Sequence, residues 1–214
     1  LSINVFILGF NHNASREGSN RIHFKIGKIG NTQVALCDSQ YNNTNSGNGY
    51  FNMNPNNSNS GGWENCHMRK TILGSDATPT SPRTNTLLAA LPADLRAVMK
   101  PATKYSDNTG GGSDTASYVT STTDLLPLLS EFEYHGARSY ANSAEKNYQA
   151  QYDYYRAGNS KVHYRHNATG TAAYAWCRSV YSGYNVYFCL VGAGGSADGG
   201  NANYSWALAP CFFV

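Results

Sequence analysis

The amino-acid sequence predicts an α+β domain with a mostly antiparallel sheet, flanking helices and long loops. Strand-like apolar runs lie near both ends of the chain, and helix-like segments lie between them. Stretches rich in Gly, Asn and Ser separate these elements. Strands grouped apart from helices are typical of α+β domains, whereas alternating strands and helices favour a parallel α/β sheet.

The N-terminal elements are expected to be strands. Residues 3–10 form a short apolar run, residues 21–29 alternate between polar and apolar side chains, and residues 33–37 form a third apolar segment. Residues 42–60 are predicted to be a loop, because Asn, Ser and Gly dominate this stretch and resist regular structure.

Two helices are expected next. The first covers residues 63–73, where apolar side chains share one face and Ser60 can cap the start. The second lies within residues 87–99, with Pro92 in a position that tolerates proline in the first turn. Residues 107–117 then form a glycine-rich loop.

The clearest helix is predicted over residues 143–157. Asn142 followed by Glu145 resembles a capping box, and Gly158 supplies a left-handed exit. Residues 122–132 are apolar but interrupted by a proline, and they are expected to form a short or broken helix.

The C-terminal strands are expected at residues 187–191 and 210–214, and the segment between them is too rich in glycine for a helix. Pairing of the first and last strands would bring the two ends of the chain together. Residues 1–214 are interpreted as one domain. Because the sequence opens in a strand and without Met, it is expected to be the C-terminal part of a longer chain.

Composition argues against two classes of partner. Charged residues make up 14% of the 214 residues, against about 25% in average proteins. The net charge is +3 without a Lys/Arg cluster, so nucleic-acid binding is not predicted. No apolar run is long enough to cross a bilayer, so membrane insertion is not predicted either.

The motifs of common catalytic and metal sites are absent from the sequence. It contains no GxSxG, HExxH or GxxxxGK[ST] pattern, and the five cysteines include no CxxC pair. Buried free thiols are therefore expected, with one disulfide in the C-terminal half as the alternative. Glu131 and Glu133 would share a face only on a strand, so a glycosidase pair is not favoured. No catalytic residue, metal ligand or cofactor is predicted, and calcium stays open because acidic residues near the C-terminus are few.

The last forty residues are the most informative. Strand-like ends enclose a middle of Tyr, Ser, Gly, Asn, Ala and Asp that carries almost no charge. Antibody loops use a similar set, in which aromatic side chains supply contact area and small polar residues supply hydrogen bonds. The pattern predicts a binding surface on a rigid frame.

Long segments also carry a family resemblance. Residues 61–70, 91–108 and 128–161, together with the ending that contains Trp176–Ser179, Phe188–Cys189 and Leu208–Pro210, resemble a domain of unknown function found in gut bacteria and their phages. The resemblance covers nearly the whole chain. It implies a C-type-lectin-like fold, and many members resemble the variable proteins of diversity-generating retroelements.

In such systems error-prone reverse transcription rewrites adenines of a template, and Asn codons are the main target. The resemblance implies a variable region at about residues 174–206 whose altered side chains share one face. Family members often read YWWLRSP where this chain has Tyr174–Val180, so two substituted positions fall there. The ligand-binding residues that it implies are Ala175, Cys177, Tyr181, Tyr184, Asn185, Val186, Tyr187, Leu190, Gly192, Gly194, Asp198, Gly199, Gly200, Asn203, Tyr204 and Trp206.

The function expected from these observations is ligand or receptor binding without catalysis. The partner would be a host-cell surface protein or glycan, and the location a phage tail or a bacterial cell surface. Display in several copies, including a homo-oligomer, would raise weak affinity by avidity. Two alternatives stay open: a lectin-fold oxidase, because Cys177–Ser179 is superficially similar to formylglycine-generating enzymes, and a structural virion component.

Overall fold

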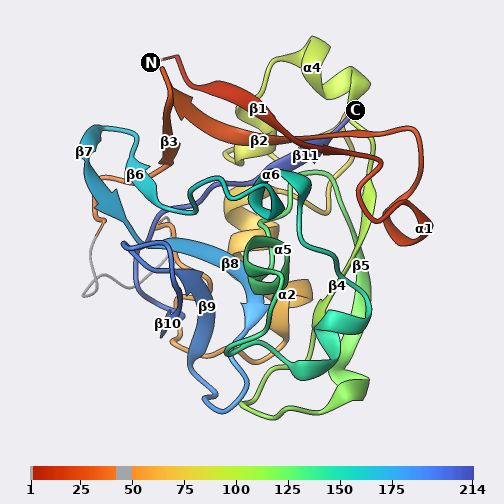
Figure 1. The fold of residues 1–214 in the computed structure, drawn as a ribbon, viewed down its shortest axis with the longest axis vertical. Coiled ribbons are helices and arrows are strands. Elements are labelled where there is room, and N and C mark those ends of the chain that lie inside the picture. The colour runs from red at the N-terminus through yellow and green to blue at the C-terminus, as the bar shows by residue number, and fades with distance from the viewer. Residues whose placement is uncertain (1, 42–49) are drawn as a thin grey trace.

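The computed structural model describes residues 2–41 and 50–214. Within them the strands, in chain order, are β1 (Asn4–Phe10), β2 (Ile22–Ile29), β3 (Thr32–Ala35), β4 (Ala102–Asp107), β5 (Val119–Asp124), β6 (His163–Arg165), β7 (Ala168–Ala173), β8 (Ala175–Val180), β9 (Tyr187–Val191), β10 (Ala197–Asn201) and β11 (Cys211–Phe213). Figure 1 shows them as separate sheets joined by long connections.

The helices of the described residues are all short. They are α1 (Ala14–Glu17), α2 (Gly62–Asn65), the π-helix η1 (Met68–Leu73), α3 (Leu87–Ala90), α4 (Ala93–Val98), the 3₁₀-helix η2 (Ala116–Tyr118), α5 (Glu131–His135), the 3₁₀-helix η3 (Ser143–Asn147) and α6 (Asp153–Arg156). None of these helices combines the length and apolarity that crossing a bilayer requires.

Three sheets are described. The largest has the order β1-β2-β3-β6-β7, with β11 also paired to β2. The second has the order β10-β9-β8, and the third is the β4-β5 pair. All of these pairs are antiparallel except β3 with β6. The predicted α+β class with a mostly antiparallel sheet is confirmed.

The prediction that the first and last strands pair with each other is wrong. β11 pairs with β2, where Phe212 lies opposite Phe24, and β1 pairs with the other edge of β2. The longer β2 is therefore the central strand, and β3 and β11 share its second edge. Both ends of the chain nevertheless lie at the same end of the molecule (Figure 1).

The predicted strands at residues 3–10, 21–29, 33–37, 187–191 and 210–214 are confirmed within a few residues. The glycine-rich segment after β9 is not a helix, as expected, and part of it forms β10 as a hairpin with β9. The loop predicted at 42–60 lies partly outside the described residues, because 42–49 are not described.

The two central helix predictions hold only in part. The helix expected at 63–73 is interrupted at Cys66, which is extended, and the next backbone N–H, that of His67, donates to the Asn54 side chain at 2.9 Å. The helix expected at 87–99 is interrupted at Leu91, because the residue before a proline avoids the helical region. Pro92 then stands before the first residue of α4 instead of within it.

The helix prediction at 122–132 is wrong, and the prediction at 143–157 holds only at its two ends, as η3 and α6. Val119–Asp124 is strand β5, and α5 begins only after Ser130, whose side chain forms a true capping box with Glu133. In the second segment, buried Glu145 accepts the Asp107 N–H at 3.0 Å instead of capping its own helix. The backbone of Tyr152 bonds to Glu133 O at 3.1 Å, so tertiary bonds replace the helical ones.

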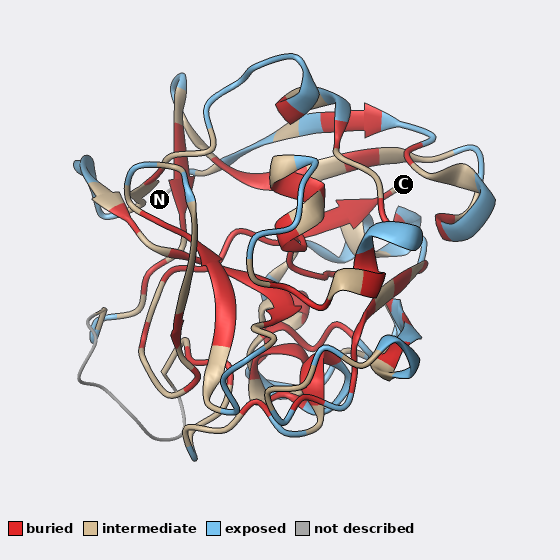
Figure 2. Ribbon diagram, turned by 60° about the horizontal axis from the view of Figure 1, so that its bottom comes forward, coloured by how far each residue is buried: buried red, intermediate tan, exposed pale blue. Residues whose placement is uncertain are grey.

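The core lies between the sheets and the short helices. Its largest cluster includes Ile26 from β2, Trp63 from α2, Trp176 from β8 and Phe212 from β11, so distant parts of the chain contribute to it. Figure 2 shows buried strands in the interior and exposed residues concentrated in outer loops and short helices. Every residue of β8 is buried, because α2, β4 and α5 pack against it in addition to its sheet neighbour β9.

Candidate ligand-binding surface

Four tyrosines gather at the connection between β8 and β9 and are here named the tyrosine cluster: Tyr140, Tyr181, Tyr184 and Tyr187. The Tyr140 and Tyr181 rings stack at 4.8 Å between centroids, and the Tyr184 and Tyr187 rings stack at 5.1 Å. Tyr181 meets Tyr184 and Tyr187 edge-on at 5.5 and 5.7 Å. Tyr184 is 56% exposed, so a large amphipathic ring is available for contact with a partner.

The backbone beneath the tyrosine cluster is held by a buried asparagine. The Asn59 side-chain amide donates to the carbonyl oxygens of Tyr184 and Tyr187 at 2.7 and 2.9 Å. Its side-chain oxygen accepts the Gly111 N–H at 2.8 Å, and its backbone N–H donates to Asn185 O at 2.9 Å. One side chain therefore fixes the 184–187 turn and ties it to the glycine-rich loop.

A glycine lets two tyrosines approach the β10 backbone. A Cβ at Gly199 would lie 2.5 Å from a ring carbon of Tyr181 and 3.4 Å from one of Tyr187. Any side chain at this position would have to displace the Tyr181 ring. Gly199 thus acts as part of the floor beneath the cluster.

A second aromatic group surrounds Trp206 and is named the tryptophan cluster: Tyr41, Tyr174, Tyr204 and Trp206. The indole lies 5.2 Å from the Tyr41 ring, 4.9 Å from Tyr174 and 6.0 Å from Tyr204. The Arg165 guanidinium lies 4.0 Å from the Tyr41 ring centroid, within range of a cation–π interaction. All four rings are half-buried.

The structure leaves eleven of the sixteen predicted residues at least partly accessible. Tyr184, Asn185 and Gly194 are exposed. The half-buried positions are Tyr181, Val186, Tyr187, Asp198, Gly199, Asn203, Tyr204 and Trp206. The tyrosine cluster and the tryptophan cluster together account for five of these positions.

Five of the predicted residues are buried, so their assignment to an exposed surface is wrong. They are Ala175, Cys177, Leu190, Gly192 and Gly200. The first two lie in the covered strand β8, and Leu190 belongs to the main core cluster. A Cβ at Gly200 would lie 2.9 Å from the Leu190 side chain, so this position is fully packed. Because β8 is buried on both faces, its sequence lacks the alternation of polar and apolar residues that would distinguish inward-facing from outward-facing positions.

Sequence reasoning missed Tyr140, Tyr41 and Tyr174, which complete the two aromatic clusters, and Asn59, which holds one of them. Tyr140 and Tyr181 are distant in sequence, and so are Tyr41 and Trp206. No periodic pattern links such positions. The only available signal was the excess of tyrosine in the chain.

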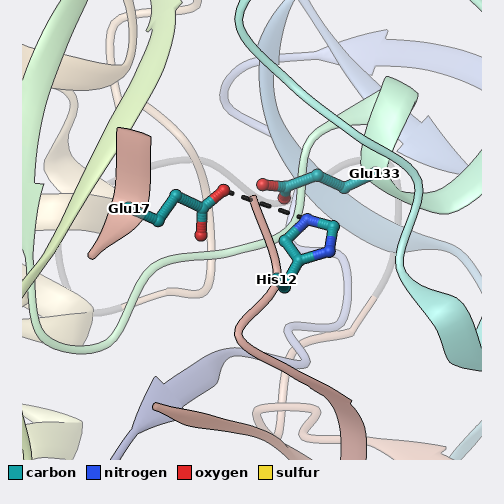
Figure 3. Close-up of side chains that lie close together, drawn as sticks. All are labelled: His12, Glu17 and Glu133. Carbon is teal, nitrogen blue, oxygen red and sulfur yellow. Dashed lines mark ion pairs between the residues drawn. The ribbon is translucent and has the colours of Figure 1, made fainter. Parts of the chain in front are cut away.

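A buried ionic cluster lies away from these aromatic groups. His12, Glu17 and Glu133 place ligand-type atoms within 4.8 Å of one another, a spacing compatible with a metal ion (Figure 3). The Lys104 ammonium, however, donates to both carboxylates, and its distance to Glu133 Oε1 is 3.0 Å. A cation of the protein itself therefore occupies the position between the two acids.

Arg178 completes the ionic cluster by donating to both carboxylate oxygens of Glu133. Burial raises the pKa of Glu133, but the Arg178 and Lys104 charges outweigh burial and hold it well below its usual range. Burial lowers the pKa of His12 to about 3, and the nearby Lys104 adds to this effect. The neutral ring of His12 stacks on Tyr152 at 3.7 Å.

Glu131 and Glu133 diverge on helix α5, so they do not form a glycosidase pair. Glu131 accepts backbone N–H groups of Ser139, Tyr140 and Ala141 at 2.8 to 3.1 Å. Glu133 points instead to the ionic cluster. Both carboxylates are saturated by protein partners.

The five cysteines all lie within the described residues, and all are free and buried. The prediction of buried free thiols is confirmed, and the alternative of a C-terminal disulfide is wrong. Burial raises the pKa of Cys66 and Cys211 to about 12, and it raises that of Cys177 well above its usual value. Reactive thiols need the opposite shift, so this environment does not favour the oxidase alternative.

Comparison with known proteins gives one result. No curated protein and no solved structure matches the chain. The family model described as "Domain of unknown function (DUF6273)" matches residues 32–214, which include every residue of both aromatic clusters. Because the match covers most of the chain, the protein belongs to the DUF6273 family.

Proposed function

We propose that this protein is a ligand-binding domain that contacts a host-cell surface protein or glycan through its two aromatic clusters. The observation that carries the proposal is the tyrosine cluster around the exposed Tyr184, held on a backbone that Asn59 fixes. Tyrosine offers a large contact area with little rotamer entropy to lose, and its hydroxyl can bond to polar partners.

Polar residues lie near the tyrosine cluster. Asn185 is exposed next to Tyr184, and Asp198 and Asn203 are half-buried. At its edge, Arg138 pairs with Asp114 at 2.9 Å and donates to Ser182 at 3.0 Å. Aromatic anchors among small hydrogen-bonding groups are typical of recognition surfaces, and binding at such a surface needs no catalytic group.

The proposal includes a C-type-lectin-like fold and diversification of the C-terminal region. Short helices, long loops, and chain ends brought together by β2 and β11 support the fold assignment. Under diversification, exchange of side chains would be confined to accessible positions such as Tyr184 and Asn185. Buried Cys177 and Leu190 would stay unchanged, because new side chains there would disrupt the core.

The proposed location is a phage tail or a bacterial cell surface. Display of several copies there would compensate for weak single contacts, since linked sites gain about 10²-fold or more in avidity.

Replacing both Tyr184 and Tyr187 with alanine should weaken binding to target cells at least about tenfold, because aromatic anchors dominate interface energetics. Binding is measured by flow cytometry, with fluorescently labelled protein on a panel of intact gut bacteria. Tyr148→Ala is the matched control, because Tyr148 is a half-buried tyrosine that stacks on Tyr105 outside both aromatic clusters. If the double variant binds the same cells as strongly as the unmodified protein, the aromatic surface is not the binding site.

A further inference from the structure

A separate cavity of about 750 Å³ lies beside the large sheet. Its wall is formed by β2 and β3, by the β6–β7 hairpin, by α6 and by the segment that follows α6. None of the sixteen predicted ligand-binding residues lines it. We propose that this cavity binds an acidic saccharide, a sugar that carries a carboxylate.

The lining of the cavity matches the hydroxyl groups of a sugar. Asn31, Thr32, Tyr164 and Thr169 line it, and their side chains form no hydrogen bond with any other described residue. Amide and hydroxyl groups both donate and accept, as sugar hydroxyls do. The volume lies within the range of about 300–1,000 Å³ that is usual for small-molecule sites.

Aromatic rings provide apolar faces for the ring carbons of a sugar. Tyr154 and Tyr164 both line the cavity, from α6 and β6 respectively. Tyr154 is fixed by its contacts with Phe6 at 4.9 Å and Tyr155 at 5.2 Å between centroids. Such a ring presents its face without loss of rotamer freedom on binding.

Lys28 supplies the charge selectivity. Its ammonium lies 4.7 Å from the Phe6 ring centroid and 5.4 Å from that of Tyr154. Among the described residues no carboxylate forms an ion pair with Lys28, and no acidic residue lines the cavity. A carboxylate on the ligand would provide the missing anionic partner in a site shielded on one side by two rings.

A buried hydrogen-bond network makes the inner wall of the cavity rigid. Gln33 is only 7% exposed, and its amide donates to Val162 O at 3.0 Å. Its side-chain oxygen accepts from Tyr155 at 3.2 Å, and the Tyr155 hydroxyl accepts from buried Lys25 at 2.7 Å. Because these side chains are already held in one conformation, the wall loses little conformational entropy when a ligand binds.

The test is an NMR titration of the ¹⁵N-labelled protein with D-glucuronate, D-glucose and inorganic phosphate. Glucuronate should produce saturable shifts at the cavity residues, with a Kd on the order of 1 mM. Glucose should bind at least about tenfold more weakly, and phosphate should produce no saturable shift at these residues. Lys28→Met should remove the preference for glucuronate over glucose, whereas the exposed control Lys146→Met should keep it.

A second variant keeps the test decisive if Lys28→Met fails to fold. Gly170→Trp places a large ring at an exposed cavity position where a Cβ would meet nothing within 4 Å, so the fold should accept it and the cavity should be blocked. Equal binding of glucuronate and glucose, phosphate shifts equal to those of glucuronate, or undiminished binding by Gly170→Trp would each overturn the proposal. Cell binding through the aromatic clusters should be unchanged in both variants.

Discussion

Replacing Arg178 with methionine should destabilise the protein by about 3–5 kcal/mol, because Glu133 stays buried and keeps only Lys104 to compensate its charge. Arg178 is fully buried, and besides Glu133 it donates to Leu128 O at 3.0 Å and Ser106 Oγ at 2.9 Å. Since the free energy of unfolding of a domain is only about 5–15 kcal/mol, this one substitution would remove a large share of it.

The measurement is urea unfolding, monitored both by tryptophan fluorescence and by circular dichroism. Arg156→Met is the matched control, because the Arg156–Asp153 pair lies on the surface and its side chain is 67% exposed. That variant should change stability by less than about 1 kcal/mol. Arg178→Met combined with Glu133→Gln should cost less than the sum of the single changes, since neither side chain of the Arg178–Glu133 pair then leaves its charged partner behind. A cost for Arg178→Met as small as for the control would contradict this account of the ionic cluster.

Lowering the pH from about 7 to about 5 should destabilise the fold by about 2–4 kcal/mol. Burial lowers the pKa of His12 to about 3 and of His23 to about 2, and Lys104 adds to both shifts. Burial also lowers the pKa of His163 well below its ordinary value. The unfolded chain therefore binds more protons than the folded protein below about pH 6.5, so stability present above this pH is lost as the pH falls.

Two carboxyl groups oppose this loss. Burial raises the pKa of Glu145 to about 7, and burial also raises that of Glu17 against the effect of Lys104. As the pH falls, these groups bind protons in the folded protein at a higher pH than in the unfolded chain. They therefore add stability until the pH reaches their ordinary pKa of 4.5. Each of these three histidines contributes about 2 kcal/mol over this interval, and His135, whose pKa burial lowers to about 4, adds to them, so the histidines outweigh the two carboxyls.

The contribution of one histidine can be isolated with His12→Phe. The ring of phenylalanine preserves the stacking on Tyr152, and His12 Nε2 has no hydrogen-bond partner among the described residues. The variant should reduce the pH-dependent loss by about 2 kcal/mol when urea unfolding is compared at the two pH values. An unchanged loss in His12→Phe, or equal stability of the unmodified protein at both pH values, would be inconsistent with a neutral, buried His12.

Sequence patterns predicted the secondary structure correctly where local preference and burial favour the same element. The alternation in β2 and the apolar residues of β9 both identify strands, since a strand buried on one or both faces leaves such a pattern. They failed to predict the break within 143–157, where Glu145 and Tyr152 have distant partners that replace helical hydrogen bonds. Helix propensity is a weak preference that tertiary contacts override.

The candidate surface shows the same limit. The exposure of Tyr184 and its neighbours agrees with the polar, glycine-rich composition of the segment. The burial of Cys177 depends on which elements cover β8, and the sequence around it does not show this, whereas the apolar run of β9 already points to the burial of Leu190. Asn59 could not be found in advance, because its role depends on a turn more than a hundred residues away, as the bond to Tyr184 O shows.

The central claim is that accessible C-terminal side chains are exchangeable and form the recognition surface. Sequencing the codons for residues 174–206 in many isolates, together with the flanking DNA, tests it most directly. The account predicts a near-identical template repeat beside a reverse-transcriptase gene, and amino-acid changes concentrated at positions such as Tyr184, Asn185 and Asp198. Unvarying codons at these three positions, or equal variation at the buried Cys177 and Leu190, would contradict it.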